Sequence, residues 1–306
     1  MNFDYHLMRF DWAGGPAGIG PGVARFARTL ESAGVRTLSV MDHFFQMSAY
    51  SPVDDPLPEG YTTLAYVAGL TERLRLRLLV GGVAYRRPGV LVKTVTTLDV
   101  LSGGRAEFGI GAGWYEREHR GLGVPLPTLA ERFEQIEETL QIALQMWSDS
   151  NGAYDGRHFQ LAETLCSPQP VSQPHPPILV GGAGEKKTLR LVAQYADACN
   201  FMLQPDECAH KIAVLREHCD RLGRDIREIA VTALLQPQPD WTPDHVVRVA
   251  EEFAAVGVSA IIGGWNPDSV AKAKPPGLAG AEPMVQIEEL FGPALDRVRA
   301  IEPAPL

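Results

Sequence analysis

The sequence predicts an α/β fold, namely a TIM (β/α)8 barrel with insertions at its carboxyl face. Short runs of Val, Ile and Leu alternate about eight times with segments whose apolar residues recur every three or four positions. Such alternation favours a parallel sheet, and eight units favour closure into a barrel over an open sheet. The length of 306 residues suits a barrel, because barrels commonly use about 250. We therefore expect a single domain over residues 1–306.

The expected strands are short, and each ends near a Gly, a Pro or a polar residue, as strands buried on both faces do. They span residues 3–10, 37–42, 74–83, 106–111, 177–180, 198–203, 229–235 and 260–262.

The clearest helical stripe lies between the fourth and fifth strands, where Phe133, Ile136, Leu140, Leu144 and Trp147 recur at helical spacing. Two stretches are longer than the connecting loops that a minimal barrel needs. Residues 46–60 are rich in Pro and Asp and predict a long loop, and residues 151–176 predict an insertion with a short hairpin. Long insertions at the carboxyl face usually shape the substrate pocket.

Composition narrows the class of protein. The formal net charge is −9, from 28 basic and 37 acidic residues, which argues against a nucleic-acid partner because such surfaces need a basic stripe. No apolar run approaches the roughly 20 residues that span a bilayer, and the first residues do not resemble a signal peptide. The four cysteines contain no C-x-x-C pair and suit a reduced compartment. We expect a cytoplasmic protein with a small-molecule substrate and no membrane partner.

The first candidate for chemistry is His43, in the run Met41-Asp42-His43-Phe44 after the second strand. Catalytic groups of barrels sit at this end of the strands, and a histidine can exchange a proton near neutral pH. The alternative is that His43 only caps the strand and bonds a carbonyl group.

Two glycine-rich strand ends follow. Gly81 and Gly82 end a β-branched strand, where they predict either a bulge that admits a flat ligand or an ordinary turn. The run Gly109-Ile110-Gly111-Ala112-Gly113-Trp114 lacks the third glycine and the acidic residue of a dinucleotide fingerprint. Its glycines are instead expected to leave room for a broad ring across the barrel mouth.

A third glycine-rich turn, residues 181–184, opens into a helix expected to begin near Glu185. Amide groups at a helix start suit a phosphate, and Lys186 or Lys187 could add charge. The alternative is a plain turn with solvated lysines. We expect the amides of Gly182, Ala183 and Gly184 to bind the anionic tail of a cofactor, while the side chain of Glu185 turns outward.

Other residue clusters in the sequence predict no functional site. Cys208, His210, His218 and Cys219 match no zinc spacing. Glu116, Glu118 and His119 are interpreted as a solvated helical turn, so no metal site is expected. The sequence also lacks the motifs of nucleophilic and nucleotide hydrolysis.

Four segments together resemble the bacterial luciferase-like superfamily. They are residues 41–44, the tract Thr96-Thr97-Leu98-Asp99-Val100-Leu101-Ser102-Gly103-Gly104-Arg105, and the glycine runs at 109–114 and 181–189. They resemble more narrowly its branch of oxidoreductases that use coenzyme F420. The likeness covers the chain from about Phe3 to about Ile301.

The resemblance implies a barrel that holds a deazaflavin or flavin at its carboxyl face. It implies a non-prolyl cis peptide that backs the ring at Gly82–Val83, an active-site role for His43, and phosphate binding by Gly181, Gly182 and Gly184. The expected cofactor-binding residues are Gly82, Val83, Gly111, Gly113, Gly181, Gly182, Ala183, Gly184 and Lys186. The branch's sugar-phosphate dehydrogenases carry a glutamate where this chain has Ala112, which argues against glucose-6-phosphate oxidation.

The favoured interpretation is an F420-dependent oxidoreductase in which a hydride passes between the deazaflavin and a small organic substrate, with His43 supplying the proton. The alternatives are an FMN-dependent monooxygenase of the same superfamily and a flavin-binding protein without turnover. A homodimer is also expected, with residues 131–147 as a candidate surface.

Overall fold

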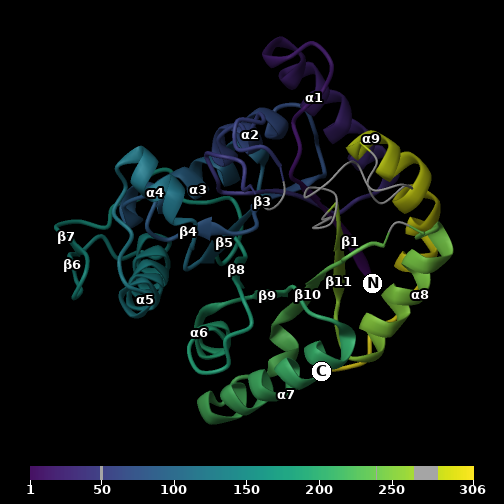
Figure 1. Ribbon diagram of the computed structural model, residues 1–306. Helices are drawn as coiled ribbons and strands as arrows, with labels where there is room; N and C mark the ends of the chain where they lie inside the picture. The colour runs from purple at the N-terminus through teal and green to yellow at the C-terminus, as the bar shows by residue number, and fades with distance from the viewer. Residues whose placement is uncertain (49–50, 239, 265–281) are drawn as a thin grey trace.

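The computed structural model describes residues 1–48, 51–238, 240–264 and 282–306. Its central feature is a closed barrel of parallel strands surrounded by helices (Figure 1). The strands run in the order β3-β2-β1-β11-β10-β9-β8-β5, and pairing of β3 with β5 closes the ring. The predicted (β/α)8 barrel is confirmed. The barrel strands are β1 (Asn2–Leu7), β2 (Thr37–Val40), β3 (Arg75–Leu78), β5 (Ala106–Gly111), β8 (Ile178–Gly181), β9 (Ala198–Phe201), β10 (Ala230–Leu234) and β11 (Ala260–Gly263).

The helices lie outside the barrel and cover its outer face (Figure 1). The longer ones are α1 (Pro16–Ala33), α2 (Gly60–Ala68), α3 (Pro88–Ser102), α5 (Leu129–Met146), α6 (Thr188–Tyr195), α7 (Pro205–Leu222) and α8 (Pro243–Ala255). Shorter turns are α4 (Glu116–Leu122), η1 (Ile226–Glu228), α9 (Pro283–Val285), η4 (Gln286–Phe291), η5 (Gly292–Ala294) and α10 (Leu295–Arg299). The hairpin predicted within residues 151–176 is confirmed as β6 (Tyr154–Asp155) and β7 (Gln160–Leu161).

The third expected strand is interrupted, as the glycine pair suggested. It divides into β3 and the short β4 (Gly81–Gly82). The expected position of the cis peptide is wrong, because the non-prolyl cis bond joins Leu79 to Val80 rather than Gly82 to Val83. At Gly82 the backbone instead continues the parallel ladder, in register with Gly111, and this pairing requires ordinary strand geometry.

Buried charges fill the barrel interior near the amino ends of its strands. The guanidinium group of Arg77, 1 % exposed, lies 3.2 Å from Asp4 and 2.6 Å from Glu107. Arg36 and Arg75 pair with the same two carboxylates from the rim, each at 2.7 Å. A buried charge is tolerated only when it is paired in this way, so this end of the barrel is a packed floor of paired charges.

Candidate active site

A cavity of about 240 Å³ opens at the carboxyl end of the barrel. Its apolar wall consists of methionine, leucine, valine and tryptophan side chains, and its polar groups include two histidines. The lining residues are His6, Met41, Asp42, His43, Met47, Leu79, Val80, Gly82, Tyr85, Gly113, Trp114 and Met202. His43 therefore lies where catalytic groups of barrels are found.

The partner of His43 is a buried carboxylate. The Nδ1 atom of His43 lies 2.9 Å from Oε2 of Glu118, whose side chain is fully buried. The interpretation of Glu118 and His119 as a solvated turn is wrong, because both are buried although they do lie in the short helix α4. The alternative that His43 bonds a carbonyl group is replaced by this ion-pair geometry.

Glu118 also holds the backbone that follows β2. Its Oε1 atom accepts the amide protons of Phe44 at 2.6 Å and Phe45 at 2.7 Å, and Oε2 accepts the hydroxyl proton of Tyr85. Burial works to raise the pKa of Glu118, but the bonds from His43, the Phe45 amide and Tyr85 outweigh it and hold that pKa below its ordinary value. The carboxylate stays ionised, so Nδ1 of His43 carries a proton, and Nε2 has no partner among the described residues and can bind a ligand.

Tyr85 is packed on two sides. Its ring stacks on His119, with centroids 4.5 Å apart and planes 11° apart, and meets the edge of Phe44 at 5.1 Å. Burial raises the pKa of Tyr85, and its bond to Glu118 raises it further. The phenol therefore remains a proton donor to Glu118.

Asp42 fixes the segment after the strand break. Its Oδ2 atom accepts the amide proton of Gly82 at 2.9 Å, and both of its oxygens accept from Arg86, at 2.7 and 2.8 Å. Arg86 reaches Glu59 as well, at 2.6 Å. The residue before His43 thus holds the loop that carries Tyr85, and paired, partly buried contacts of this kind give a rigid wall.

His6 is the second histidine of the cavity. Its Nδ1 atom lies 3.0 Å from Oγ of Ser39, and that hydroxyl donates its own proton to the carbonyl of Tyr5. Burial, and after it the charge of Arg77, lower the pKa of His6 to about 3. His6 is therefore neutral, with its proton on Nδ1 and Nε2 left as an acceptor.

The glycines at two strand ends make room for a side chain of the protein itself. A Cβ atom on Gly111 would lie 2.6 Å from Cγ2 of Val80, and one on Gly181 would lie 2.9 Å from the same side chain. The expectation that Gly111 leaves room for a broad ring is thus corrected, since Val80 occupies that space. Gly82 and Gly113 do line the cavity, whereas Val83 lines a separate pocket.

The expected phosphate turn follows β8. Its helix, α6, begins at Thr188 rather than near Glu185, because residues 185–187 form a turn. The amide of Gly182 already donates to the carbonyl of Asn200 at 3.2 Å. Within the residues that the structure describes, the amides of Ala183 and Gly184 have no such partner and are the two left for an anion.

The charged residues of this turn point apart. Glu185 faces α7, where it pairs with Lys211 and with His210 at 3.0 Å, and its carbonyl accepts from His218 at 2.8 Å. The ammonium group of Lys187 lies 5.5 Å from the ring centre of Phe133, and Lys186 is exposed. Glu185 therefore leaves the glycine turn without a competing negative charge.

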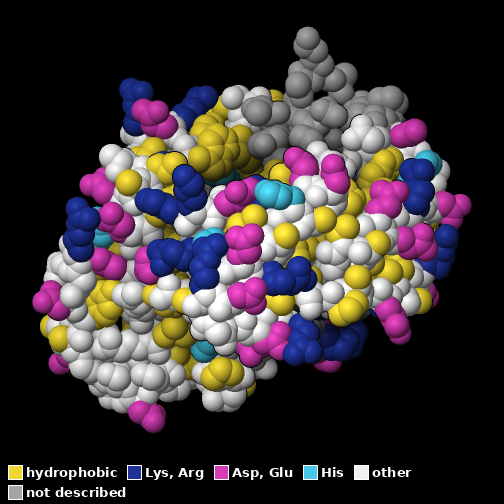
Figure 2. Space-filling view, turned by 90° about the horizontal axis from the view of Figure 1, so that it is seen from below, with side chains coloured by type: hydrophobic (Ala, Val, Ile, Leu, Met, Phe, Trp, Pro, Cys, Tyr) yellow, Lys and Arg dark blue, Asp and Glu magenta, His cyan; other side chains and the backbone are white. Residues whose placement is uncertain are grey.

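The rest of the described surface and the cysteines offer no further candidate active-site residue. Acidic and basic side chains lie close together across the face in Figure 2. All four cysteines are buried and free. In the described parts of the chain, no helix has the length and apolar character needed to cross a bilayer.

Comparison with known proteins agrees with this barrel fold. The model of the luciferase-like monooxygenase family matches residues 1–288. The uncharacterised protein Rv0953c of Mycobacterium tuberculosis is 31 % identical over 267 residues, 83 % of this chain and 89 % of that protein. An F420-dependent glucose-6-phosphate dehydrogenase of Kineococcus radiotolerans is 32 % identical over 167 residues, 54 % of this chain and 48 % of that protein.

The fold is shared with solved structures at lower identity. The monooxygenase RslO1 from Streptomyces bottropensis superposes with a TM-score of 0.76 at 16 % identity, over 98 % of this chain and all of that one. The fold is a TIM barrel, and the family match makes the protein an oxidoreductase. The chain belongs to the luciferase-like monooxygenase family, which includes both F420-dependent and FMN-dependent members.

Proposed function

We propose that this protein is a coenzyme F420-dependent oxidoreductase that acts on a small organic substrate, with His43 as the group that exchanges the proton. The observation that carries the proposal is the His43–Glu118 pair on the wall of the mouth cavity. A buried carboxylate on Nδ1 fixes one tautomer and orients the ring, so Nε2 is the ring nitrogen that can exchange a proton with a ligand.

The residues present fit a deazaflavin. The cavity of about 240 Å³ is somewhat smaller than the roughly 300–1,000 Å³ that hold whole ligands, so it suits the ring while the tail lies outside. Leu79, Val80 and Trp114 offer apolar surface to a ring, and the free amides of Ala183 and Gly184 suit the phosphate of the tail. When bound, the deazaflavin supplies or accepts the hydride.

The protein's own contribution is then to position a proton and exclude water. For reduction of a carbonyl substrate, Nε2 of His43 donates to the oxygen that gains charge; for oxidation of an alcohol, it accepts the hydroxyl proton. The fully buried Glu118 balances the resulting positive charge. Trp114 lies 5.8 Å from the His43 ring, centre to centre, and lines the same cavity.

The residue after β5 argues against the substrate of the sugar-phosphate dehydrogenase relative. At the position after β5, Ala112 offers no carboxylate, and its carbonyl is held by Arg132 at 3.0 Å. Glu118, the carboxylate of the described residues that pairs with His43, is already bound by four donors. These features argue against glucose-6-phosphate as substrate.

A second candidate is an FMN-dependent monooxygenase. The likeness to the monooxygenase RslO1 over nearly the whole chain supports keeping it. In that case the same apolar wall would shield the flavin from water, and His43 would serve in proton transfer.

Titration with each cofactor tests the proposal. Addition of F420 to the purified protein should change the violet absorbance and quench the fluorescence saturably, with affinity at least about tenfold above that for FMN. Reduced F420 should then be oxidised by members of a panel of small carbonyl compounds under anaerobic conditions. Binding of FMN in preference to F420, with oxygen consumption on reduction, would establish the second candidate instead.

A further inference from the structure

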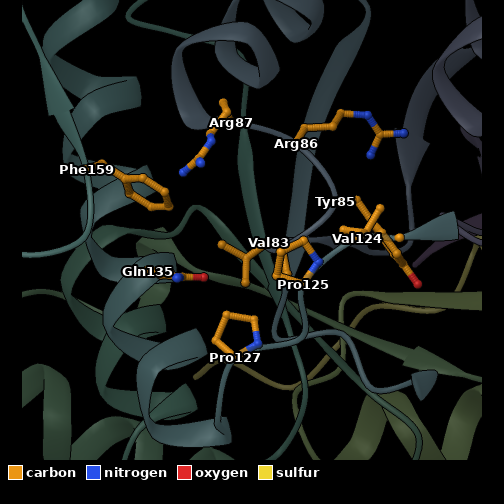
Figure 3. A pocket seen from close by; sticks show the side chains of 11 residues that line it. Val83, Tyr85, Arg86, Arg87, Val124, Pro125, Pro127, Gln135 and Phe159 are labelled. Atoms are coloured by element: carbon orange, nitrogen blue, oxygen red, sulfur yellow. The ribbon is translucent and has the colours of Figure 1, made fainter. Parts of the chain in front are cut away.

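A second pocket lies beside the mouth cavity and shares Tyr85 with it (Figure 3). It has a volume of about 330 Å³ and lies between the segment after β4, the loop between α4 and α5, and the β6–β7 hairpin region. Its lining residues are Val83, Ala84, Tyr85, Arg86, Arg87, Gly123, Val124, Pro125, Pro127, Gln135 and Phe159. None of the roles discussed above uses this space.

The walls of this side pocket are apolar and rigid. Val83 and Phe159 are nearly fully buried, at 2 % and 7 % exposure, so they cannot turn away from the pocket. Two prolines, Pro125 and Pro127, face them across the hollow (Figure 3). Arg132 anchors this rim, because it donates to the carbonyls of Pro127 and Ala112. A preformed apolar hollow of this size is the usual form of a small-molecule site.

Two polar side chains face the hollow without a partner in the described part of the chain. Figure 3 shows the guanidinium group of Arg87 directed between Phe159 and Val83, with the amide of Gln135 opposite. Arg86 instead points away, toward its bonds with Asp42 and Glu59. Arg87 therefore provides a positive charge that is free to bind an anion.

Nearby carboxylates do not neutralise Arg87, because each is bound elsewhere. Glu131 closes the capping box with Thr128 at the start of α5. Glu134 pairs with Arg157 at 2.9 Å and His158 at 2.7 Å. Glu138 accepts the amides of residues 157–159.

We propose that this side pocket binds a small carboxylate with a flat apolar or aromatic body. The carboxylate pairs with the fork of Arg87 and accepts from the amide of Gln135, while the body lies between Val83, Phe159 and the prolines. The site is distinct from the proposed cofactor site. A bound ligand touches the outer side of Tyr85, whose hydroxyl bonds Glu118, so it lies one side chain from the catalytic pair.

Binding of 4-fluorobenzoate, followed by fluorine NMR, tests the proposal on the intact protein without cofactor. We expect saturable binding with a dissociation constant on the order of 1 mM, as suits about ten heavy atoms. Arg87→Gln should weaken it about tenfold or more, because a charged hydrogen-bonded contact is lost. Neutral 4-fluorobenzamide should also bind more weakly than the acid.

Two matched variants locate the site. Arg28→Gln removes another exposed arginine, on α1 and outside both pockets, and should leave the affinity unchanged. Met202→Trp fills the mouth cavity, which Met202 lines, and should also leave it unchanged. Equal affinity in Arg87→Gln and the native protein, or loss of binding in Met202→Trp, would overturn the proposal. Neither outcome depends on whether F420 binds.

Discussion

The Nδ1 atom of His43 and the Oε2 atom of Glu118 lie 2.9 Å apart although 75 positions separate the two residues in the chain. The strand end that carries His43 and the helix that carries Glu118 belong to different loops of the barrel mouth. One carboxylate thus fixes the ring that is best placed for proton transfer, and the same carboxylate holds two backbone amides of the His43 loop.

Replacement of His43 by Ala should keep the fold and the affinity for cofactor but lower turnover by about two to four orders of magnitude, the usual contribution of a positioned acid or base. Steady-state kinetics with the best substrate of the carbonyl panel measures the loss, and the cofactor titration is the control. Normal turnover in His43→Ala would leave His43 with a purely structural role.

Glu118→Gln should lower kcat by about ten- to a hundredfold with little change in KM, since it removes a charged hydrogen bond to His43. Nitrogen NMR of the His43 ring should report a mixture of tautomers in place of the single Nδ1–H form.

The pH dependence gives a second signature of Glu118. Its pKa is lowered by folding, so the stabilising contribution of the carboxylate is present above the ordinary glutamate pKa of about 4.3 and is lost as the pH falls through the lower folded value. Acid unfolding of the native protein should therefore be steeper below about pH 4.3 than that of Glu118→Gln. Equal kcat and equal acid unfolding in the two proteins would contradict a positioning role.

Gly182→Val should weaken cofactor binding more than Lys186→Ala or Lys187→Ala. Gly182 has φ of 114°, where a β-branched residue is strained, and any shift displaces the free amides of Ala183 and Gly184. Cofactor titrations of the three variants provide the measurement. If the lysine variants lose binding while Gly182→Val retains it, side-chain charge rather than the backbone holds the tail.

His6→Gln should flatten the loss of stability in acid. The unfolded chain takes up a proton at residue 6 below about pH 6.5, whereas folded His6 does so only near its pKa of about 3. Native stability therefore falls with falling pH across this window, by up to about 1.4 kcal/mol per pH unit from this group. Urea unfolding from pH 7 to pH 4 measures the slope, and parallel slopes for the two proteins would refute the assignment.

Gly111→Ala should destabilise the barrel by about 1–3 kcal/mol through overpacking, because the added Cβ lies 2.6 Å from Val80. The double variant with Val80→Ala should recover part of the loss. Urea unfolding of the two single variants and the double variant measures the coupling between these positions. Additive effects would show that Val80 does not occupy this space.

Hydrophobic alternation was sufficient to predict the barrel and its strands, since each buried strand leaves a run of Val, Ile and Leu. Position alone placed His43 at the mouth, because the carboxyl ends of parallel strands converge there. The glycine pair at 81–82 indicated a break in the third strand but not which peptide departs from the trans form. No local pattern in the sequence distinguishes the peptide between Leu79 and Val80 from its neighbours.

Glu118 escaped prediction for a physical reason. Its helix is only seven residues long, too short for a hydrophobic period to separate a buried face from an exposed one. Neighbouring charges at 116, 117 and 120 give the segment a solvated appearance. The phosphate turn shows a similar limit, because the amide of Gly182 bonds Asn200 through strand pairing that sequence order does not disclose.

The charged floor formed by Asp4, Arg77 and Glu107 also determines the order in which ligands bind and dissociate. In the residues that the structure describes, these side chains close the barrel at the amino ends of its strands. A molecule that enters the mouth cavity must therefore leave through the same opening. When two molecules bind in a cavity with a single opening, the one that binds first dissociates last. Leu79 and Val80 line this cavity, and a ring seated against them leaves its other face to the substrate. Turnover should therefore be compulsorily ordered, with the cofactor loading before the substrate and leaving after the product.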